Sequence, residues 1–191
     1  EEILRRENCP RQDGRLTVGW AVKARKPNRE FLREVCRCIL WLREEWDADS
    51  VLIPFFYDAA LGVCEAVAQQ LEGQTGCLLL KYLSEETLSI IGCMDVLVGV
   101  RLHSLIYAAV MGVPMIGVSY DPKVDSFLSS IERPTHFTVE NFTLEGFQTV
   151  FRETMRDREA ISAATAQCLD GLISKLDQNE ELIRMLMEQS K

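Results

Sequence analysis

Apolar residues along this chain occur in two alternating arrangements, short continuous runs and longer stretches with helical spacing. The runs span residues 16–22, 51–56, 77–80, 96–98 and 113–118. Such runs are typical of strands that are buried on both faces. Between them, apolar residues recur three and four positions apart, which predicts amphipathic helices. Past His136 the pattern is helical to the end of the sequence.

Strands that alternate with helices favour a parallel sheet covered on both faces. Right-handed crossovers then lead to a doubly wound sheet, for which we expect the strand order 3-2-1-4-5. The predicted fold class is α/β, a Rossmann-like doubly wound parallel sheet with C-terminal helices. We expect residues 16–142 to form the sheet domain, residues 1–15 to form a linker and residues 143–191 to form the closing helices.

Composition narrows the class of protein. The 191 residues are 47% hydrophobic and 26% charged, which is ordinary for a soluble globular domain. The longest stretch without a charged residue or histidine, 104–120, is broken by two glycines and a proline, so we predict no membrane helix. The opening residues lack the apolar core of a signal peptide.

Charge and cysteine usage exclude further classes. The net charge of -8 argues against a general nucleic-acid binder, although residues 1–45 carry a local excess of +3. Seven cysteines without a C-x-x-C pair, together with only two histidines, favour reduced thiols over a zinc site. We therefore expect no metal, no nucleic-acid partner and a cytoplasmic location.

Candidate chemistry lies where ligands bind in such sheets, beyond the carboxyl ends of the strands at the point where the winding reverses. Three segments follow the first, fourth and fifth predicted strands. They contribute Lys23 with Arg25, then Arg101-Leu102-His103, then Tyr120 to Lys123. Because these three strands are expected to be neighbours, the sequence predicts that these side chains gather at one edge of the sheet.

The cations in two of these segments occupy electrostatically unfavourable positions. A helix N-terminus carries a partial positive charge, which disfavours cations. Arg101 and His103 start one predicted helix, and Lys123 starts the next, just after Asp121 and Pro122. An anion between them would remove the conflict, and helix N–H groups with Arg and Lys suit a phosphate or carboxylate.

Each of these residues also has a structural interpretation. Arg101 could be a surface ion-pair partner, Lys123 a solvated side chain and His103 a structural histidine at a helix start. His136, in a loop, is more typical of packing or solvent exposure than of catalysis. Spacing alone does not separate these interpretations from a binding site.

Two paired motifs resemble a known family. Residues 94–109, which contain R-L-H at 101–103, precede Gly112-Val113-Pro114, and Y-D-P-K-V follows at 120–124. This segment resembles the polysaccharide pyruvyl transferase family, in particular its CsaB type, which decorates bacterial secondary cell-wall polymers. The specific match covers about residues 94–128, and the opening strand and residues 53–58 agree more loosely.

The resemblance implies a GT-B-like enzyme with two Rossmann-like domains facing a cleft. This chain would then be the second half, the donor-binding domain, with residues 1–15 as the linker from a missing N-terminal domain. The implied reaction moves a pyruvyl group from phosphoenolpyruvate, as donor substrate and with no cofactor, onto two hydroxyls of a sugar, forming a ketal. The acceptor would be a cell-wall polysaccharide or its precursor, which could be lipid-linked and keep the enzyme near a membrane surface.

The resemblance also implies residue roles. It maps Arg101, Leu102 and His103 onto the donor pocket. As a hypothesis consistent with these residues, we take Arg101 and His103 as catalytic candidates and Lys123, Lys23 and Tyr120 as further phosphoenolpyruvate contacts. An arginine usually ends the opening strand in the family, whereas this chain has Lys23, which cannot make the same two-pronged carboxylate contact unless Arg25 replaces it.

Two other readings stay open. The first is a GT-B glycosyltransferase or sugar-nucleotide epimerase, whose second domain also binds phosphates at these strand ends. The second is a non-catalytic Rossmann-like binding domain. Protection against heating by phosphoenolpyruvate but not by UDP-sugars would favour pyruvyl transfer.

Overall fold

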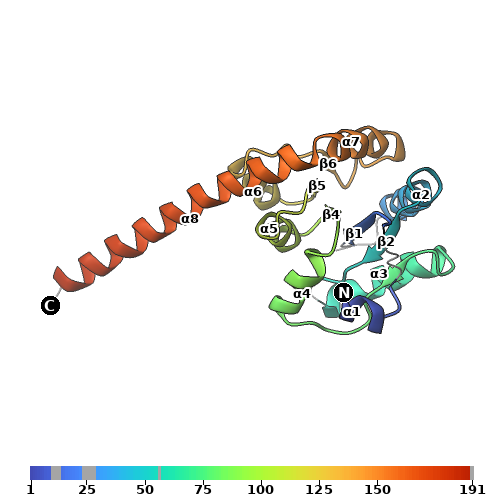
Figure 1. Cartoon of the computed structure of the whole chain (residues 1–191), viewed down its shortest axis with the longest axis horizontal. Coiled ribbons are helices and arrows are strands. Elements are labelled where there is room, and N and C mark those ends of the chain that lie inside the picture. Colours follow the sequence, from blue (N-terminus) through green and yellow to red (C-terminus); the bar gives the residue numbers. More distant parts are fainter. Residues whose placement is uncertain (10–13, 23–28, 56, 190–191) are drawn as a thin grey trace.

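A six-stranded parallel sheet forms the centre of the computed structural model, which describes residues 1–9, 14–22, 29–55 and 57–189 (Figure 1). The strand order is β3-β2-β1-β4-β5-β6, which confirms the predicted order and adds a strand at one edge. The strands are β1 (Thr17–Ala21), β2 (Asp49–Leu52), β3 (Gly76–Cys77), β4 (Val96–Gly99), β5 (Met115–Ser119) and β6 (Phe137–Thr138). The helices are α1 (Glu2–Arg6), α2 (Arg29–Trp46), α3 (Tyr57–Gln70), α4 (Ser84–Ile91), α5 (Leu102–Val110), α6 (Pro122–Ser130), α7 (Leu144–Arg156) and α8 (Arg158–Gln189).

Alternate residues of the central strands point to two separate cores. In β1, Val18 and Trp20 belong to one buried cluster and Ala21 to the other. Helices α2, α3 and α7 contribute to the first cluster, whereas α1, α4, α5, α6 and the start of α8 contribute to the second. The sheet is therefore a layer between two helical layers, as right-handed crossovers on either side of β1 require.

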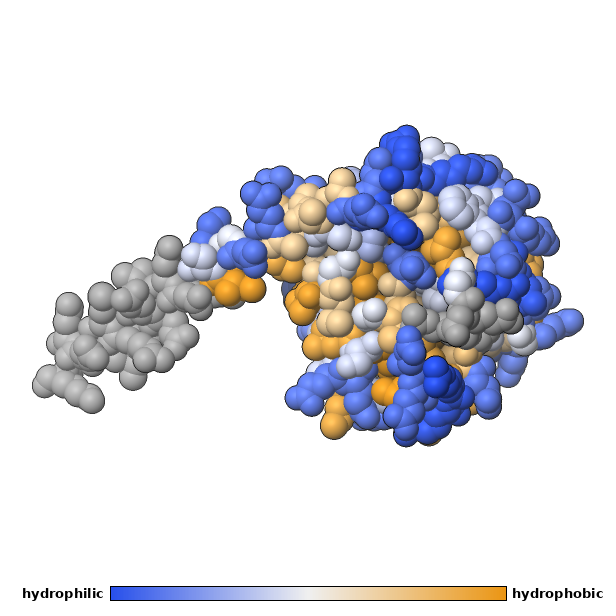
Figure 2. Space-filling model, viewed as in Figure 1, coloured by the Kyte–Doolittle hydropathy of each residue, from blue (hydrophilic) through white to orange (hydrophobic). Residues whose placement is uncertain are grey.

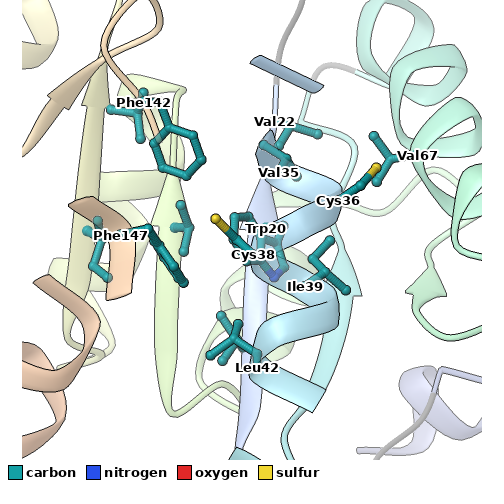
Figure 3. Close-up of a cluster of buried hydrophobic side chains, with 14 of the residues drawn as sticks. Trp20, Val22, Val35, Cys36, Cys38, Ile39, Leu42, Val67, Phe142 and Phe147 are labelled. Atoms are coloured by element: carbon teal, nitrogen blue, oxygen red, sulfur yellow. The ribbon is translucent and has the colours of Figure 1, made fainter. Parts of the chain in front are cut away.

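Aromatic rings fill the first core (Figure 3). The Trp20 ring lies 5.4 Å from that of Phe147 on α7, and Trp41 on α2 meets Phe147 and Phe151 edge to face. The buried Trp20 indole donates a hydrogen bond of 3.2 Å to the Ser50 hydroxyl on β2. This bond satisfies the one polar group of a fully buried tryptophan and explains how a serine is accommodated inside a strand.

Two predicted strands differ from those observed. β2 spans Asp49–Leu52 rather than 51–56, because Pro54 has no N–H for the ladder. β3 covers only Gly76–Cys77, whereas the sequence predicted a strand over 77–80. Leu79 and Leu80 are about half exposed. An edge position explains the short strand, since it pairs on one side alone.

The prediction of helix throughout the region after His136 is wrong at one place. Phe137–Thr138 form β6, which pairs in parallel with the end of β5. The pairing continues as the Val139 amide donates to the Ser119 carbonyl at 3.1 Å. Two residues are too few for periodicity to identify a strand.

The first nine residues pack onto the sheet domain. Leu4 and Cys9 are buried in the second core. The Glu7 carboxylate accepts hydrogen bonds of 3.1 Å from the amides of both Leu79 and Leu80. These are amides that the short strand β3 leaves outside the sheet ladder, and Glu7 satisfies them instead.

Helix α8 starts against α5 and then extends well beyond the sheet (Figure 1). Hydrophobic side chains show at the base of this extension (Figure 2), and Val110, Met111 and Ile173 are among the exposed large hydrophobic residues. Within the described residues, no helix has the length and apolar character needed to cross a bilayer.

Candidate functional site

The carboxyl edge of the sheet brings together the segments that the sequence singled out. β4 pairs with β1 on one side and with β5 on the other. The winding reverses between β1 and β4, the position where open α/β sheets bind ligands. Lys23 and Arg25, which follow β1, lie outside the described residues. The site below is therefore built from the ends of β4 and β5 and from the loops beside them.

Arg101 stands between β4 and α5 as the N-cap residue of the helix. Its carbonyl accepts from the Ser104 hydroxyl at 2.6 Å, which secures the first turn. Gly99 permits this tight passage, since a Cβ there would lie 2.6 Å from Leu105 Cδ2 and 2.9 Å from Ser104 Oγ. The close approach sets the start of α5 directly over the end of the strand.

A hydrogen bond links the Arg101 side chain to Tyr120, which follows β5. Burial lowers the pKa of the Arg101 guanidinium, while the tyrosine opposes this shift. Arginine stays protonated at any physiological pH, so the group is a permanent, partly buried positive charge. The R-L-H segment and the Y-D-P-K-V segment are thus in direct contact through their first residues.

Lys123 lies in the first turn of α6, where its backbone amide donates to the Asp121 carboxylate at 2.9 Å. This confirms Asp121 as the N-cap and Pro122 as the first helical residue. The Lys123 side chain is exposed. Asp125, one turn further, accepts from Ser119 at 2.9 Å and from Thr135 at 2.7 Å. This carboxylate ties the end of β5 to the segment before β6.

His103 is exposed and lines a cavity of about 410 Å³. The loops after β2 and β3 line the same cavity. Among the predicted site residues that the structure describes, His103 alone belongs to this cavity wall. Arg101, Leu102, Tyr120 and Lys123 lie at the same edge but beyond the cavity, and Leu102 packs partly against the second core.

The other walls of the cavity come from α4, α5 and the loops after β2 and β3, of which the sequence analysis singled out only residues 53–58 and the R-L-H segment at the start of α5. Phe55 follows β2 and meets Tyr107 of α5 edge to face, with ring centroids 5.6 Å apart. Lys81 and Tyr82 follow β3. The Tyr82 hydroxyl donates to the Glu7 carboxylate. These residues could have been found by the same rule as Arg101, because they also follow carboxyl ends of strands.

The arrangement is electropositive at the α5 start. Arg101 and His103 stand at a helix end whose first turn holds no acidic residue. The helix dipole adds partial positive charge at the same place. Chemically, the edge combines a guanidinium for a planar oxyanion, an imidazole for proton transfer and an adjoining cavity with mixed aliphatic, aromatic and polar walls.

Comparison with protein families places residues 21–122 in a family model described as polysaccharide pyruvyl transferase. That match covers just over half of the chain, from the last residue of β1 through β5, and it includes Arg101, Leu102, His103 and Tyr120. A search of curated proteins found no match.

Solved structures share the fold at low sequence identity. The C-terminal CMP-Kdo binding domain of WaaA from Acinetobacter baumannii is 11% identical, with a TM-score of 0.56 over 88% of this chain and 94% of that one. The C-terminal domain of a group 1 glycosyl transferase (LpcC) from Francisella tularensis is 15% identical, with a TM-score of 0.57 over 89% and 90%. A structure from work on EarP-mediated arginine glycosylation of elongation factor EF-P is 10% identical, with a TM-score of 0.65 over 98% and 65%.

Proposed function

The chain belongs to the polysaccharide pyruvyl transferase family, and we propose that it transfers a pyruvyl group from phosphoenolpyruvate to two hydroxyls of a sugar in a cell-wall polysaccharide or its precursor. Family and fold already indicate a transferase that modifies polysaccharides, with the fold of glycosyltransferase C-terminal domains. The proposal adds the donor, the ketal product and the residues that act on them.

The contact between Arg101 and Tyr120 carries the proposal. It holds a permanent positive charge at the reversal of the sheet, beside the first turns of α5 and α6. Phosphoenolpyruvate carries a planar carboxylate and a tetrahedral phosphate. A guanidinium can bind either of these oxyanions through two N–H groups. Lys123 is proposed to bind the second anionic group, together with Lys23.

In the proposed mechanism, His103 donates a proton to the methylene carbon of phosphoenolpyruvate. The resulting cation at C2 is attacked by one sugar hydroxyl, whose proton returns to His103. The C2–O bond to phosphate then breaks, and inorganic phosphate departs with the bonding electron pair. A second hydroxyl attacks C2, and its proton leaves with the phosphate. Arg101 and Lys123 stabilise the negative charge that develops on the departing phosphate, which lowers the activation free energy of the transfer.

The cavity beside His103 is proposed to receive the acceptor. It opens next to the imidazole and is walled by aromatic residues Phe55, Tyr82 and Tyr107, with Lys81 at its margin. Aromatic walls suit the apolar faces of a sugar ring, and the polar groups suit its hydroxyls. Donor and acceptor would then meet on either side of His103.

Donor binding is the direct test. Calorimetric titration with phosphoenolpyruvate is expected to give saturable binding, which Arg101→Gln weakens about 10-fold or more, since a charge-assisted contact contributes about 1.5–3 kcal/mol. Arg33→Gln, at an exposed arginine of α2, serves as the control and is expected to bind normally. UDP-sugars and CMP-Kdo are titrated in parallel. Binding of a nucleotide sugar without phosphoenolpyruvate binding would contradict the proposal and support a glycosyltransferase.

A further inference from the structure

A second cavity, of about 470 Å³, shares no lining residue with the cavity near His103. It lies beside the connection from α6 to β6, in which Thr135 donates a hydrogen bond to Asp125 of α6. Arg133 and His136 on this connection line the cavity, and Glu153, Arg156 and Asp157 from the end of α7 line its other side.

Arg133 lacks a neutralising partner. Its side chain makes no hydrogen bond or ion pair with any other described residue, and its Nε is a buried donor without an acceptor. Arg156, in the same cavity, is by contrast paired with Asp157 at 2.9 and 2.7 Å. A partly buried guanidinium that no acid neutralises is unfavourable in a folded protein, and burial lowers the pKa of Arg133.

His136 stands beside Arg133 with a second unused polar atom. Its Nδ1 is buried without a hydrogen-bond partner, and its ring packs at a tilt against Phe137. Burial, and then the charge of Arg133, lower the pKa of His136 to about 4. The imidazole is therefore neutral at pH 7 and can donate one hydrogen bond as well as accept one.

We propose that Arg133 and His136 form a binding site for a small free carboxylic acid in its carboxylate form, separate from the candidate donor site. The planar two-oxygen head of a carboxylate matches the forked guanidinium. Val150 and Ile161, also in the cavity wall, leave apolar surface for an alkyl body.

The charges around the cavity select a single negative charge over a double one. Arg133, Glu153, Arg156 and Asp157 line the cavity together with His136, and their formal charges cancel. Arg156 forms an ion pair with Asp157, and Glu153 lies near Arg156. The charges that remain available to a ligand are therefore the positive charge of Arg133 and the negative charge of Glu153. A monocarboxylate matches the single charge of Arg133, whereas a phosphate dianion carries one charge more and is repelled twice as strongly by Glu153.

The chain offers a direct probe, because its two histidines report on the two sites separately. Proton NMR resolves the imidazole Cε1–H signals, which His103→Asn and His136→Asn assign. Sodium butyrate is titrated against sodium chloride and inorganic phosphate at equal ionic strength. We expect butyrate to shift the His136 signal saturably, with a smaller effect of phosphate and none of chloride.

Substitutions separate the arginine fork from general charge. Arg133→Gln is expected to weaken butyrate binding at least 10-fold, and Arg133→Lys, which keeps the charge, to weaken it less. Arg152→Gln, on α7 but over the Trp41 ring, is the matched control and should bind normally. Circular dichroism confirms that each variant is folded. Binding should also tighten from pH 7 to pH 6, where butyrate stays ionised, since a bound anion offsets the charge of Arg133 and favours protonated His136.

Several outcomes would overturn the site. These are no saturable shift of the His136 signal, an equal shift with chloride or phosphate, or an undiminished shift in Arg133→Gln. A His136 signal that changes with protein concentration in the absence of butyrate would mean that an acidic group of a second copy fills the cavity. None of these results bears on phosphoenolpyruvate, whose binding is read from the His103 signal.

Discussion

Arg101 and Tyr120 are hydrogen-bonded across the ends of two neighbouring strands, β4 and β5. The in-register pairing of Gly99 with Gly117 brings the segments that follow the two strands side by side. Each residue begins one of the two motifs that resemble the family. Their contact explains physically why the motifs occur together, since each one positions part of a shared positively charged edge.

Tyr120→Phe removes the phenolic oxygen from this contact and leaves the ring. Because a net hydrogen bond contributes about 0.5–1.5 kcal/mol, phosphoenolpyruvate should bind roughly 2- to 10-fold more weakly. The melting temperature should change little, since Tyr120 is 39% exposed. Calorimetry and a thermal melt measure the two quantities. Unchanged donor affinity in a folded variant would show that the tyrosine does not help to place Arg101.

Gly99→Ala should destabilise the fold and disturb the start of α5. The new Cβ would meet Leu105 Cδ2 at 2.6 Å and Ser104 Oγ at 2.9 Å, which forces the helix away from β4. Overpacking of this kind costs about 1–3 kcal/mol of unfolding free energy, measured by urea denaturation.

Gly62→Ala is the matched control for that substitution. Gly62 lies in α3, and a Cβ there meets nothing within 4 Å. Alanine is a better helix former than glycine, so this variant should gain about 0.5–1 kcal/mol. Equal effects of the two substitutions would contradict the steric explanation for Gly99.

Ser50→Ala should cost about 1–3 kcal/mol, because it leaves the buried Trp20 indole N–H without an acceptor. Ser126→Ala, at an exposed position of α6, should stay within about 0.5 kcal/mol of the wild type. Urea denaturation followed by tryptophan fluorescence compares the two variants. A loss no larger than that of the control would mean that the indole finds another acceptor.

His136→Gln should change how stability depends on pH. The pKa of His136 is about 4 in the folded state and about 6.5 in the unfolded chain. Between these values the unfolded state binds more protons, so this group makes the wild type lose stability as pH falls from about 6.5 to 4. Glutamine does not titrate, and its variant should lose less over that window. Urea denaturation at pH 7, 5.5 and 4.5 measures the difference, and parallel curves would refute the shifted pKa.

The main sheet could be predicted because its central strands are long enough to form recognisable continuous runs of apolar residues. Val18 to Val22 and Val96 to Val98 are continuous apolar runs, and their burial on both faces explains why. The start of α6 at Asp121-Pro122 could also be predicted, because an N-cap residue followed by proline is a helix-start signal that depends only on the local sequence.

Features that depend on distant partners could not be predicted. β6 is two residues long and exists through its pairing with β5. The isolated position of Arg133 is visible only once α7 and the α6–β6 connection are packed together. Lys23, which the sequence assigned to the donor site, stays a prediction because it lies outside the described residues.

Glu7 supports Leu79 and Leu80 from 72 and 73 positions away, and it also accepts from Tyr82. The loop after β3, which lines the cavity near His103, therefore depends on the opening segment of the chain for its conformation. Transferring this loop into a homologous protein to change its acceptor specificity would require transferring the opening segment as well. Without Glu7, the backbone amides of Leu79 and Leu80 would lose their hydrogen-bond acceptor.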